Sequence, residues 1–146
     1  MEHVHFLEYI ESVSPLIGEE KALDILKGNI VQRRLRWYNM NKEKLALSGR
    51  PLEDAYTLLT ERLKILDDSE IYEKGERSIT FRVKKPCPVH EACQIKEVDP
   101  KRFCKAICEG AANDFLNKIY PGLAFRIEHK KDKNGEYAVE TIELKR

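Results

Sequence analysis

Four cysteines are the residues in this sequence best suited to metal or nucleophilic chemistry. Cys87, Cys93, Cys104 and Cys108 lie within 22 consecutive positions, and His90 lies between the first two. Thiolate sulfur and imidazole nitrogen are preferred zinc ligands, and four thiolates also hold iron–sulfur clusters. The spacing C-x5-C followed by C-x3-C differs from the paired C-x2-C knuckles of many zinc sites. We therefore expect a zinc or iron–sulfur site with ligands drawn from these five residues.

The second pair of cysteines has another explanation. Asp99-Pro100 is typical of a helix start. Cys104 and Cys108, four positions apart, would share one face of that helix. The same face carries apolar side chains, and reduced cysteine is often buried as a small apolar residue. The pair therefore fits either two metal ligands or two core thiols.

Cys87 also fits the role of a nucleophile. It follows a predicted strand, lies between Pro86 and Pro88, and has Lys84 and Lys85 close by. Positive charge near a thiol lowers its pKa and increases the thiolate fraction. A cysteine-dependent hydrolase is therefore an alternative function, and an ordinary loop cysteine explains the same residues.

The elements that must position these residues change in type near residue 69. Before it, apolar residues recur at helical spacing in three stretches, which start near Val4, Ala22 and Leu52. We expect the first helix to end at Ser14-Pro15. After residue 69, apolar and polar residues alternate over Ile79–Val83, which predicts a strand with one buried face.

Two further strands are predicted at the end of the chain. Asn134-Gly135 favours a type I′ turn, in which both central residues have positive φ. Cross-strand pairs of matching character support the register that follows from this turn. The predicted pairs are Phe125 with Leu144, Arg126 with Glu143, Ile127 with Ile142, and His129 with Glu140.

This order of elements predicts a single α+β domain over residues 1–146. The helical part covers residues 1–68, and residues 69–146 hold a strand, the cysteine loop, a helix and a hairpin. The cysteine-bearing helix should cover the apolar face of a small antiparallel sheet. A chain of 146 residues buries enough surface to fold without a metal or disulfide.

The charge balance bears on the partners. With 26 Lys and Arg against 25 Asp and Glu, the net charge is +1, which excludes a global basic field for nucleic acid. A local run, Arg33, Arg34 and Arg36 beside Trp37 and Tyr38, leaves a nucleic-acid-binding regulator as a second alternative. The solvated face of a helix explains the same run.

Targeting signals are not visible in the sequence. No apolar stretch approaches the roughly 20 residues of a membrane span, and the N-terminus lacks the basic start of a secretory signal. We expect no membrane partner and a cytosolic location, where thiols stay reduced.

A family resemblance is carried by three segments. Phe81–Pro88 ends a predicted strand in Cys-Pro, Cys104 and Cys108 follow on a helix, and a hairpin spans Phe125–Leu144. With these features, residues 70–146 resemble the 4-vinyl reductase-like small-molecule-binding superfamily. That superfamily includes the methanogen output domain and the 2-amino-thiazoline-4-carboxylate hydrolase family. Where its members have Gly-Asp-x-x-Cys, this chain reads Gly135-Glu-Tyr-Ala-Val, so the final cysteine is absent.

The resemblance implies an α+β domain that binds a small molecule or a metal ion and often forms a homodimer. Its hydrolase branch would make Cys87 a nucleophile toward a small cyclic amide or thiazoline-like substrate. The leading hypothesis is a cytosolic, sensor-like binding domain with a zinc or iron–sulfur site, in which His90 is the reserve ligand.

Overall fold

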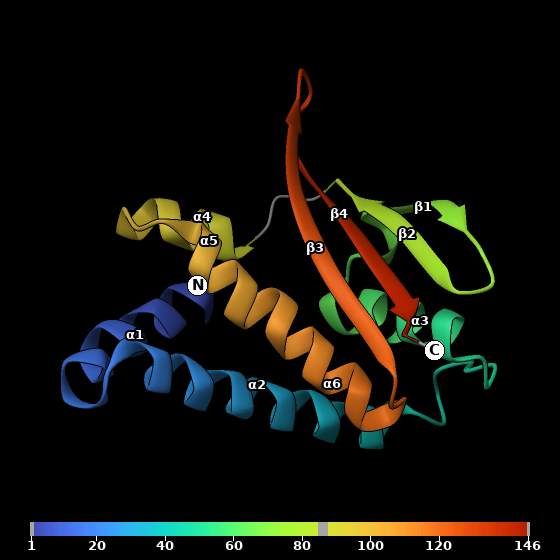
Figure 1. Cartoon of the computed structure of the whole chain (residues 1–146), viewed down its shortest axis with the longest axis horizontal. Helices are drawn as coiled ribbons and strands as arrows, with labels where there is room; N and C mark the ends of the chain where they lie inside the picture. The colour runs from blue at the N-terminus through green and yellow to red at the C-terminus, as the bar shows by residue number, and fades with distance from the viewer. Residues whose placement is uncertain (1, 85–87, 146) are drawn as a thin grey trace.

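A computed structural model describes residues 2–84 and 88–145 of the chain. Within these residues the fold is α+β, with helices first and an antiparallel sheet completed by the C-terminal hairpin (Figure 1). The predicted fold class is therefore confirmed. Cys87, which the sequence made both a candidate ligand and a candidate nucleophile, lies outside the described residues.

The first two helices form an antiparallel pair. α1 (Glu2–Ile17) and α2 (Glu19–Asn41) are joined at Gly18, whose φ of 91° suits a glycine. The predicted end of the first helix at Pro15 is wrong. The helix continues for two residues beyond Pro15, and the Gly18 N–H donates to the Ser14 carbonyl at 2.8 Å.

The third helix, α3 (Pro51–Leu63), is fixed at its start by a buried carboxylate. Asp54 is 2% exposed and accepts hydrogen bonds from the backbone N–H groups of Ser48 and Gly49 and from the Tyr120 hydroxyl. These bonds join the loop before α3 to the far end of the chain's last helix. A short 3-10 turn, η1 (Leu66–Asp68), leads into the sheet.

The sheet has the strand order β1-β2-β4-β3, and all three pairings are antiparallel. β2 matches the predicted strand, whereas β1 was not predicted. Five of the six β1 residues are exposed, so this edge strand has no buried face to give it an alternating pattern. The strands are β1 (Ser69–Lys74), β2 (Ser78–Val83), β3 (Leu123–Asp132) and β4 (Gly135–Leu144).

The predicted hairpin register is wrong by two residues. Phe125 lies opposite Ile142, and His129 lies opposite Ala138 rather than Glu140. The turn falls one residue earlier than predicted, because the Asp132 carboxylate accepts from the Asn134 N–H at 2.8 Å. A shift of two keeps every side chain on its predicted face.

The Arg126–Glu143 ion pair also survives this shift as a diagonal contact. The Arg126 Nη1 and the Glu143 Oε1 lie 2.9 Å apart, although Arg126 is opposite Thr141. Only Gly135 has positive φ at this turn, so it is not the type I′ turn that the sequence favoured.

The segment expected as a cysteine loop is largely helical. Cys93 lies in α4 (Pro88–Lys96) and is fully buried, so its predicted place on a loop is wrong. One continuous helix then runs from Pro100 to Ile119. Its parts are α5 (Pro100–Phe103), the π-helical η2 (Cys104–Gly110) and α6 (Ala111–Ile119).

Two groups of buried apolar side chains hold the fold together. The first lies between the sheet, α3 and α6, and includes Phe81, Phe115 and Ile142. The second lies among α1, α2, α4 and η2, and includes Leu26 and Ile107. The helix from Pro100 to Ile119 contributes to both cores, so it joins the helical part to the sheet.

Candidate metal site and adjoining cavity

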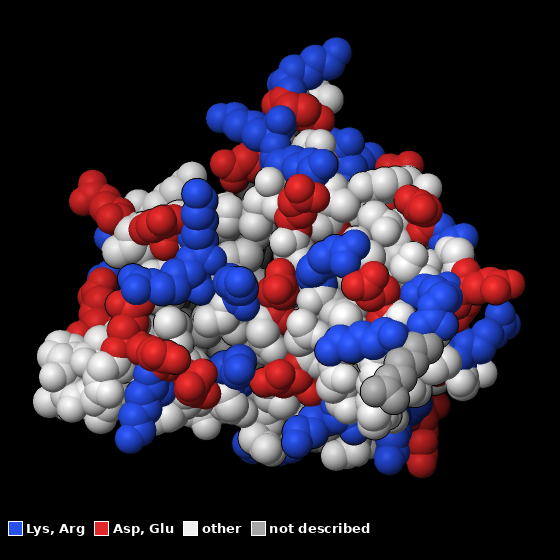
Figure 2. All heavy atoms as spheres, viewed as in Figure 1, with Lys and Arg blue, Asp and Glu red and all other residues white. Residues whose placement is uncertain are grey.

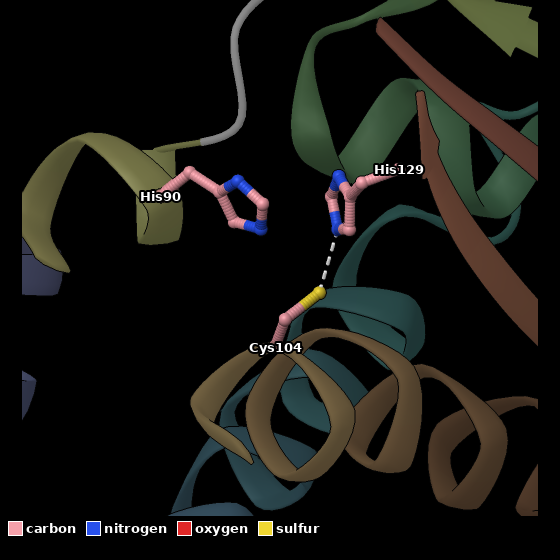
Figure 3. A group of neighbouring side chains, drawn as sticks. All are labelled: His90, Cys104 and His129. Carbon is pink, nitrogen blue, oxygen red and sulfur yellow. Dashed lines mark hydrogen bonds between the residues drawn. The ribbon is translucent and has the colours of Figure 1, made fainter. Parts of the chain in front are cut away.

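Three potential metal ligands converge from three separate elements. His90 comes from α4, Cys104 from the start of η2 and His129 from β3, and Figure 3 shows the three side chains directed toward one another. One ligand atom from each residue lies within 4.8 Å of the other two. Among the described residues this is the group of histidine, cysteine or acidic side chains with that geometry.

Each side chain is placed by the local structure around it. Pro88 begins α4, and two residues later His90 projects from its first turn. Along β3, alternation puts Phe125, Ile127 and His129 on the face that packs against the helix. Cys104 is 5% exposed and faces the same space from below in Figure 3.

The closest contact joins the thiol to an imidazole. The Cys104 Sγ lies 2.7 Å from the His129 Nε2. The two imidazole rings lie next to each other, with their centroids 4.0 Å apart and their planes at 34°. The site therefore brings one sulfur and two histidine rings into contact.

The surroundings of Cys104 favour the thiolate. A side-chain hydrogen bond from Cys108 lowers the pKa of Cys104 most, and burial opposes this effect. The hydrogen bond to His129 and the electrostatic interactions with His129 and His90 lower it further, to about 5. Cys104 is therefore an anionic ligand or nucleophile at neutral pH.

The π-helical geometry of η2 begins at this cysteine. In a π-helix the hydrogen bonds run between residues five apart, and such stretches often mark functional sites. Cys104 and Cys108 were predicted to lie on one face of a regular helix, and both lie in this wider stretch instead.

Two polar residues of the helix from Pro100 to Ile119 form hydrogen bonds that hold β3 next to Cys104. The Asn113 side chain donates to the Phe125 carbonyl at 2.8 Å and accepts from the Phe125 N–H at 3.0 Å. The Glu109 carboxylate accepts from the Ile127 N–H at 3.1 Å. Both are positioning residues, because they fix the strand that carries His129 against the helix that carries Cys104.

Two cavities adjoin the cluster. A smaller one of about 180 Å³ is lined by His90, His129, Lys130 and Tyr137, among others. A larger one of about 320 Å³ lies between the helices and the sheet, and His129 and Cys108 contribute to its wall. Cys104 itself lines neither cavity.

The structure brings together only part of the predicted ligand set. His90 and Cys104 belong to the cluster, whereas Cys108 lies beside Cys104 without being part of it. Cys93 is enclosed in the second apolar core. His129, which the sequence pointed to only as a cross-strand or proton-transfer partner of Glu140, is the candidate ligand that sequence reasoning missed.

The three arginines of the basic run on α2 have different surroundings. Arg33 lies over the Phe6 ring at 5.4 Å, Arg34 lines the larger cavity and Arg36 is exposed. Trp37 and Tyr38 pack against the first core. In Figure 2, basic and acidic side chains are interspersed over the visible face.

Comparisons with known proteins give little information. No family model and no curated protein matches the chain. One solved structure, an Fe(II) unliganded mutant of the H-NOX protein from K. algicida, shares 15% identity and covers 99% of this chain and 96% of its own. The TM-score is 0.41, which does not establish a shared fold. Among the described helices, none has the length and apolar character needed to cross a bilayer.

Proposed function

We propose that His90, Cys104 and His129 bind a transition metal ion, with zinc as the first candidate. The observation that carries this proposal is the convergence of three ligand atoms within 4.8 Å from three separate elements. The resemblance of residues 70–146 to a superfamily of small-molecule- and metal-binding domains supports the same function.

The donor set favours zinc over an iron–sulfur cluster. Two imidazoles and one thiolate suit zinc, and the same set with a weak axial ligand suits copper. Iron–sulfur clusters are held by cysteine thiolates, or by two cysteines and two histidines in Rieske centres. The cluster in the described residues supplies one thiolate, so it fits a single ion better.

A zinc ion requires one distance within the cluster to lengthen. Zinc–nitrogen bonds of about 2.0–2.1 Å and a zinc–sulfur bond of about 2.3 Å place tetrahedral ligand atoms about 3.3–3.6 Å apart. Because the Cys104 Sγ and the His129 Nε2 are 2.7 Å apart, they must separate by about 0.9 Å to admit the ion.

Three protein ligands leave a fourth position for another group. Structural zinc sites are closed by four protein ligands, whereas three ligands and an open position are typical of sites that exchange ligands. His90 and His129 both line the smaller cavity, which gives a small molecule or water access to the ion. We therefore propose an exchangeable site suited to sensing or binding rather than a purely structural one.

The test is metal binding by protein freed of metal with a chelator. We expect one zinc ion per chain, and a near-ultraviolet thiolate charge-transfer band when cobalt replaces zinc. Cys104→Ser should lose this band, and Cys93→Ala, which changes a buried thiol outside the cluster, should keep it. Cobalt binding without a thiolate band, or an unchanged band in Cys104→Ser, would rule out the assigned ligand.

Two further measurements test Cys87 as a ligand and an iron–sulfur cluster as the bound group. Cys87→Ser tests the predicted contribution of that residue as a fourth ligand. Anaerobic purification followed by iron and sulfide analysis tests the iron–sulfur alternative, which predicts a brown protein.

A thiol nucleophile is the second candidate function, and one observation favours it. The pKa of Cys104 of about 5 and its contact with His129 resemble an activated cysteine–histidine pair. This moves the proposed nucleophile from Cys87 to Cys104. Because Cys104 is 5% exposed and lines neither cavity, metal binding is the better-supported function.

Alkylation separates these two functions. In metal-free protein at pH 7, a substrate-accessible nucleophile at Cys104 would react with iodoacetamide faster than a thiol of an unfolded peptide. We expect slow alkylation instead, because the sulfur is enclosed, and further protection when zinc is added.

A further inference from the structure

The larger cavity has the size and lining of a site for an apolar molecule. Its volume of about 320 Å³ is at the lower end of the range for ligand pockets. Most of its described wall consists of aliphatic and aromatic side chains from both halves of the molecule, including Ile30, Val83, Ile107 and Phe125. Protein interiors leave few voids larger than a water molecule, so an apolar space of this size is unusual.

Hydrogen bonds keep this cavity from closing. Phe125 and Ile127 of β3 line it, as do residues of the helix from Pro100 to Ile119. The Asn113 side chain bonds to the Phe125 backbone at 2.8 Å and 3.0 Å. The Glu109 carboxylate accepts from the Ile127 N–H at 3.1 Å. Because these bonds fix the strand relative to the helix, the cavity is preformed rather than created by a ligand.

The charged side chains of the described wall favour a neutral ligand over an ion. Arg34 and Glu140 line the cavity, and each already has an interaction partner within the protein. The Arg62 Nε is inaccessible to solvent, and Lys64 is exposed, so water screens its charge. An ion would leave bulk water for an apolar space in which these groups give it little compensation, and such a transfer is costly.

The cavity is open to the surface at the end of α3. Leu63 and Lys64 both line it, and both are exposed. Water inside would be weakly held, because a buried water molecule needs about two to four polar partners and most of the wall is apolar. Replacing weakly held water by an apolar group increases affinity. An apolar molecule is therefore a better occupant than water.

We propose that this cavity binds a neutral, hydrocarbon-like molecule. A cavity of about 150 Å³ lined by leucine, isoleucine and phenylalanine binds benzene. The space here is about twice as large, so it suits a molecule of about ten to twelve non-hydrogen atoms that carries at most a hydroxyl or carbonyl group. This inference goes beyond the proposed metal binding and does not depend on it.

The test compares one molecular body in three charge states by calorimetry on metal-free protein at pH 7. The probes are 1-adamantanol, 1-adamantanecarboxylate and 1-adamantylammonium, with octanol and octanoate as a flexible pair. We expect each alcohol to bind at least about tenfold more tightly than the corresponding ions, because the ions lose hydration in the cavity. Absence of binding by both alcohols, or an ion that binds as tightly as its alcohol, would overturn the proposal.

Nuclear Overhauser contacts locate the bound molecule in the native protein. Bound 1-adamantanol should show contacts with the methyl groups of Ile30, Ile107 and Ile127, which line the cavity. It should show none with Ile79 and Ile142, which are buried but lie outside the described wall. Contacts with the second group and none with the first would refute the assigned cavity.

A variant that fills the cavity gives a second measure of location. Ala112→Leu enlarges a side chain of the wall and should weaken 1-adamantanol binding by about tenfold or more, because the ligand and the new side chain compete for the same space. Ala106→Leu makes the same change at a partly buried position outside the described wall and should leave binding unchanged. Circular dichroism checks that both variants are folded. Unchanged binding in folded Ala112→Leu would contradict the proposal.

The metal proposal and this one fail separately. The binding measurements use metal-free protein, and Cys104→Ser, which removes the thiolate of the candidate metal site, should bind 1-adamantanol as the native protein does. Binding of 1-adamantanol by a native protein that gives no cobalt–thiolate band would support this proposal and refute the assigned metal ligand. A cobalt–thiolate band without 1-adamantanol or octanol binding would do the reverse.

Discussion

Cys104 combines two properties that seldom occur together, deep burial and a strongly lowered pKa. Burial by itself stabilises the neutral thiol, so the low pKa reflects the side chains of Cys108, His129 and His90 around it. These neighbours stabilise negative charge on the sulfur, and a metal ion would do the same.

The titration of Cys104 should be visible in the metal-free protein. Its pKa of about 5 lies below the ordinary thiol value of 9.0. A thiolate ultraviolet band should therefore be present at pH 7 and disappear as the pH falls through about 5, and Cys104→Ser should lack it. A thiolate that forms only near pH 9 would contradict the electrostatic account of the site.

The lowered pKa of Cys104 also makes the unfolding free energy depend on pH. Because the folded protein holds the thiolate more strongly than the unfolded chain does, this contribution is fully present above pH 9 and is lost as pH falls through about 5. In metal-free protein, the difference in unfolding free energy between the native chain and Cys104→Ser should grow from pH 5 to pH 9.

Asp54 is a second buried ionisable residue, and its role is structural. Burial tends to raise the pKa of its carboxyl, but hydrogen bonds from Ser48, Tyr120 and Gly49 outweigh burial and lower it. Burial, together with the contact with Asp54, raises the pKa of Tyr120. The carboxylate therefore holds three segments together.

We expect Asp54→Asn to lower the unfolding free energy by roughly 2–4 kcal/mol, because buried donors lose a charged acceptor. Urea denaturation at pH 7 measures this change, and Asp67→Asn, at an exposed position, should have little effect. The difference should shrink as pH falls below the ordinary carboxyl pKa of 3.8, because the unfolded chain then binds a proton that the folded protein, with its lowered pKa, does not yet hold. A difference that grows as pH falls below 3.8 would contradict this account.

At the scale of elements, the Cys104–His129 contact depends on how β3 lies against the helix. Asn113 and Asn117 both bond to the β3 backbone, Asn113 at Phe125 and Asn117 at Leu123. Asn113 is closer to the metal site along the strand. The two residues therefore form a matched pair with different distances to the ligands.

Asn113→Ala should weaken zinc binding by about tenfold or more, because β3 loses two bonds that fix His129 opposite Cys104. Asn113→Ala and Asn117→Ala should each lower the unfolding free energy by about 1–2 kcal/mol, but Asn117→Ala should leave zinc affinity unchanged. Zinc competition and urea denaturation on both variants measure the two effects. Equal zinc affinities would show that Asn113 has no positioning role.

The elements also show what local sequence patterns can predict. Ile79–Val83 and the apolar face around Phe115 follow regular periods, so their type and buried face were predicted correctly. β1 is exposed and carries no period, and the Asp132 side chain moved the hairpin turn by one residue. Elements with a buried face could be predicted from the spacing of their apolar residues, whereas a turn set by one side-chain hydrogen bond could not.

The site itself was only partly predictable for a related reason. Cys104 and His129 are 25 positions apart, and their contact depends on the helix packing on the sheet rather than on spacing. Pro86 and Pro88 favour a loop in the sequence, and this predicts Cys93 as a loop ligand. Pro88 instead begins α4, where proline is tolerated at the first position.

At the scale of the whole molecule, the candidate metal site lies where the two cores meet. α4 belongs to the second core, β3 to the first, and the helix from Pro100 to Ile119 to both. An ion held by ligands from all three would connect the helical part to the sheet. Metal binding should therefore stabilise the complete fold rather than one segment.

Zinc should raise the unfolding free energy in proportion to its occupancy. At a free zinc concentration 100 times the dissociation constant, the expected gain is about 2.7 kcal/mol. Thermal denaturation with and without zinc measures the gain, a chelator should reverse it, and Cys104→Ser should not show it. A shift of equal size in Cys104→Ser would place the stabilising ion elsewhere.

The π-helical stretch has a consequence for how this chain could have arisen. Hydrogen bonds five residues apart enclose one residue more than those of an α-helix. A single inserted residue can therefore be absorbed at η2, so that Phe103 and Phe115 on either side still face their own cores. In an ancestor without the insertion, we expect this helix to be one residue shorter and uniformly α-helical. The placement of Cys104 as a candidate ligand would then have arisen through a change in the length of the helix rather than through substitution alone.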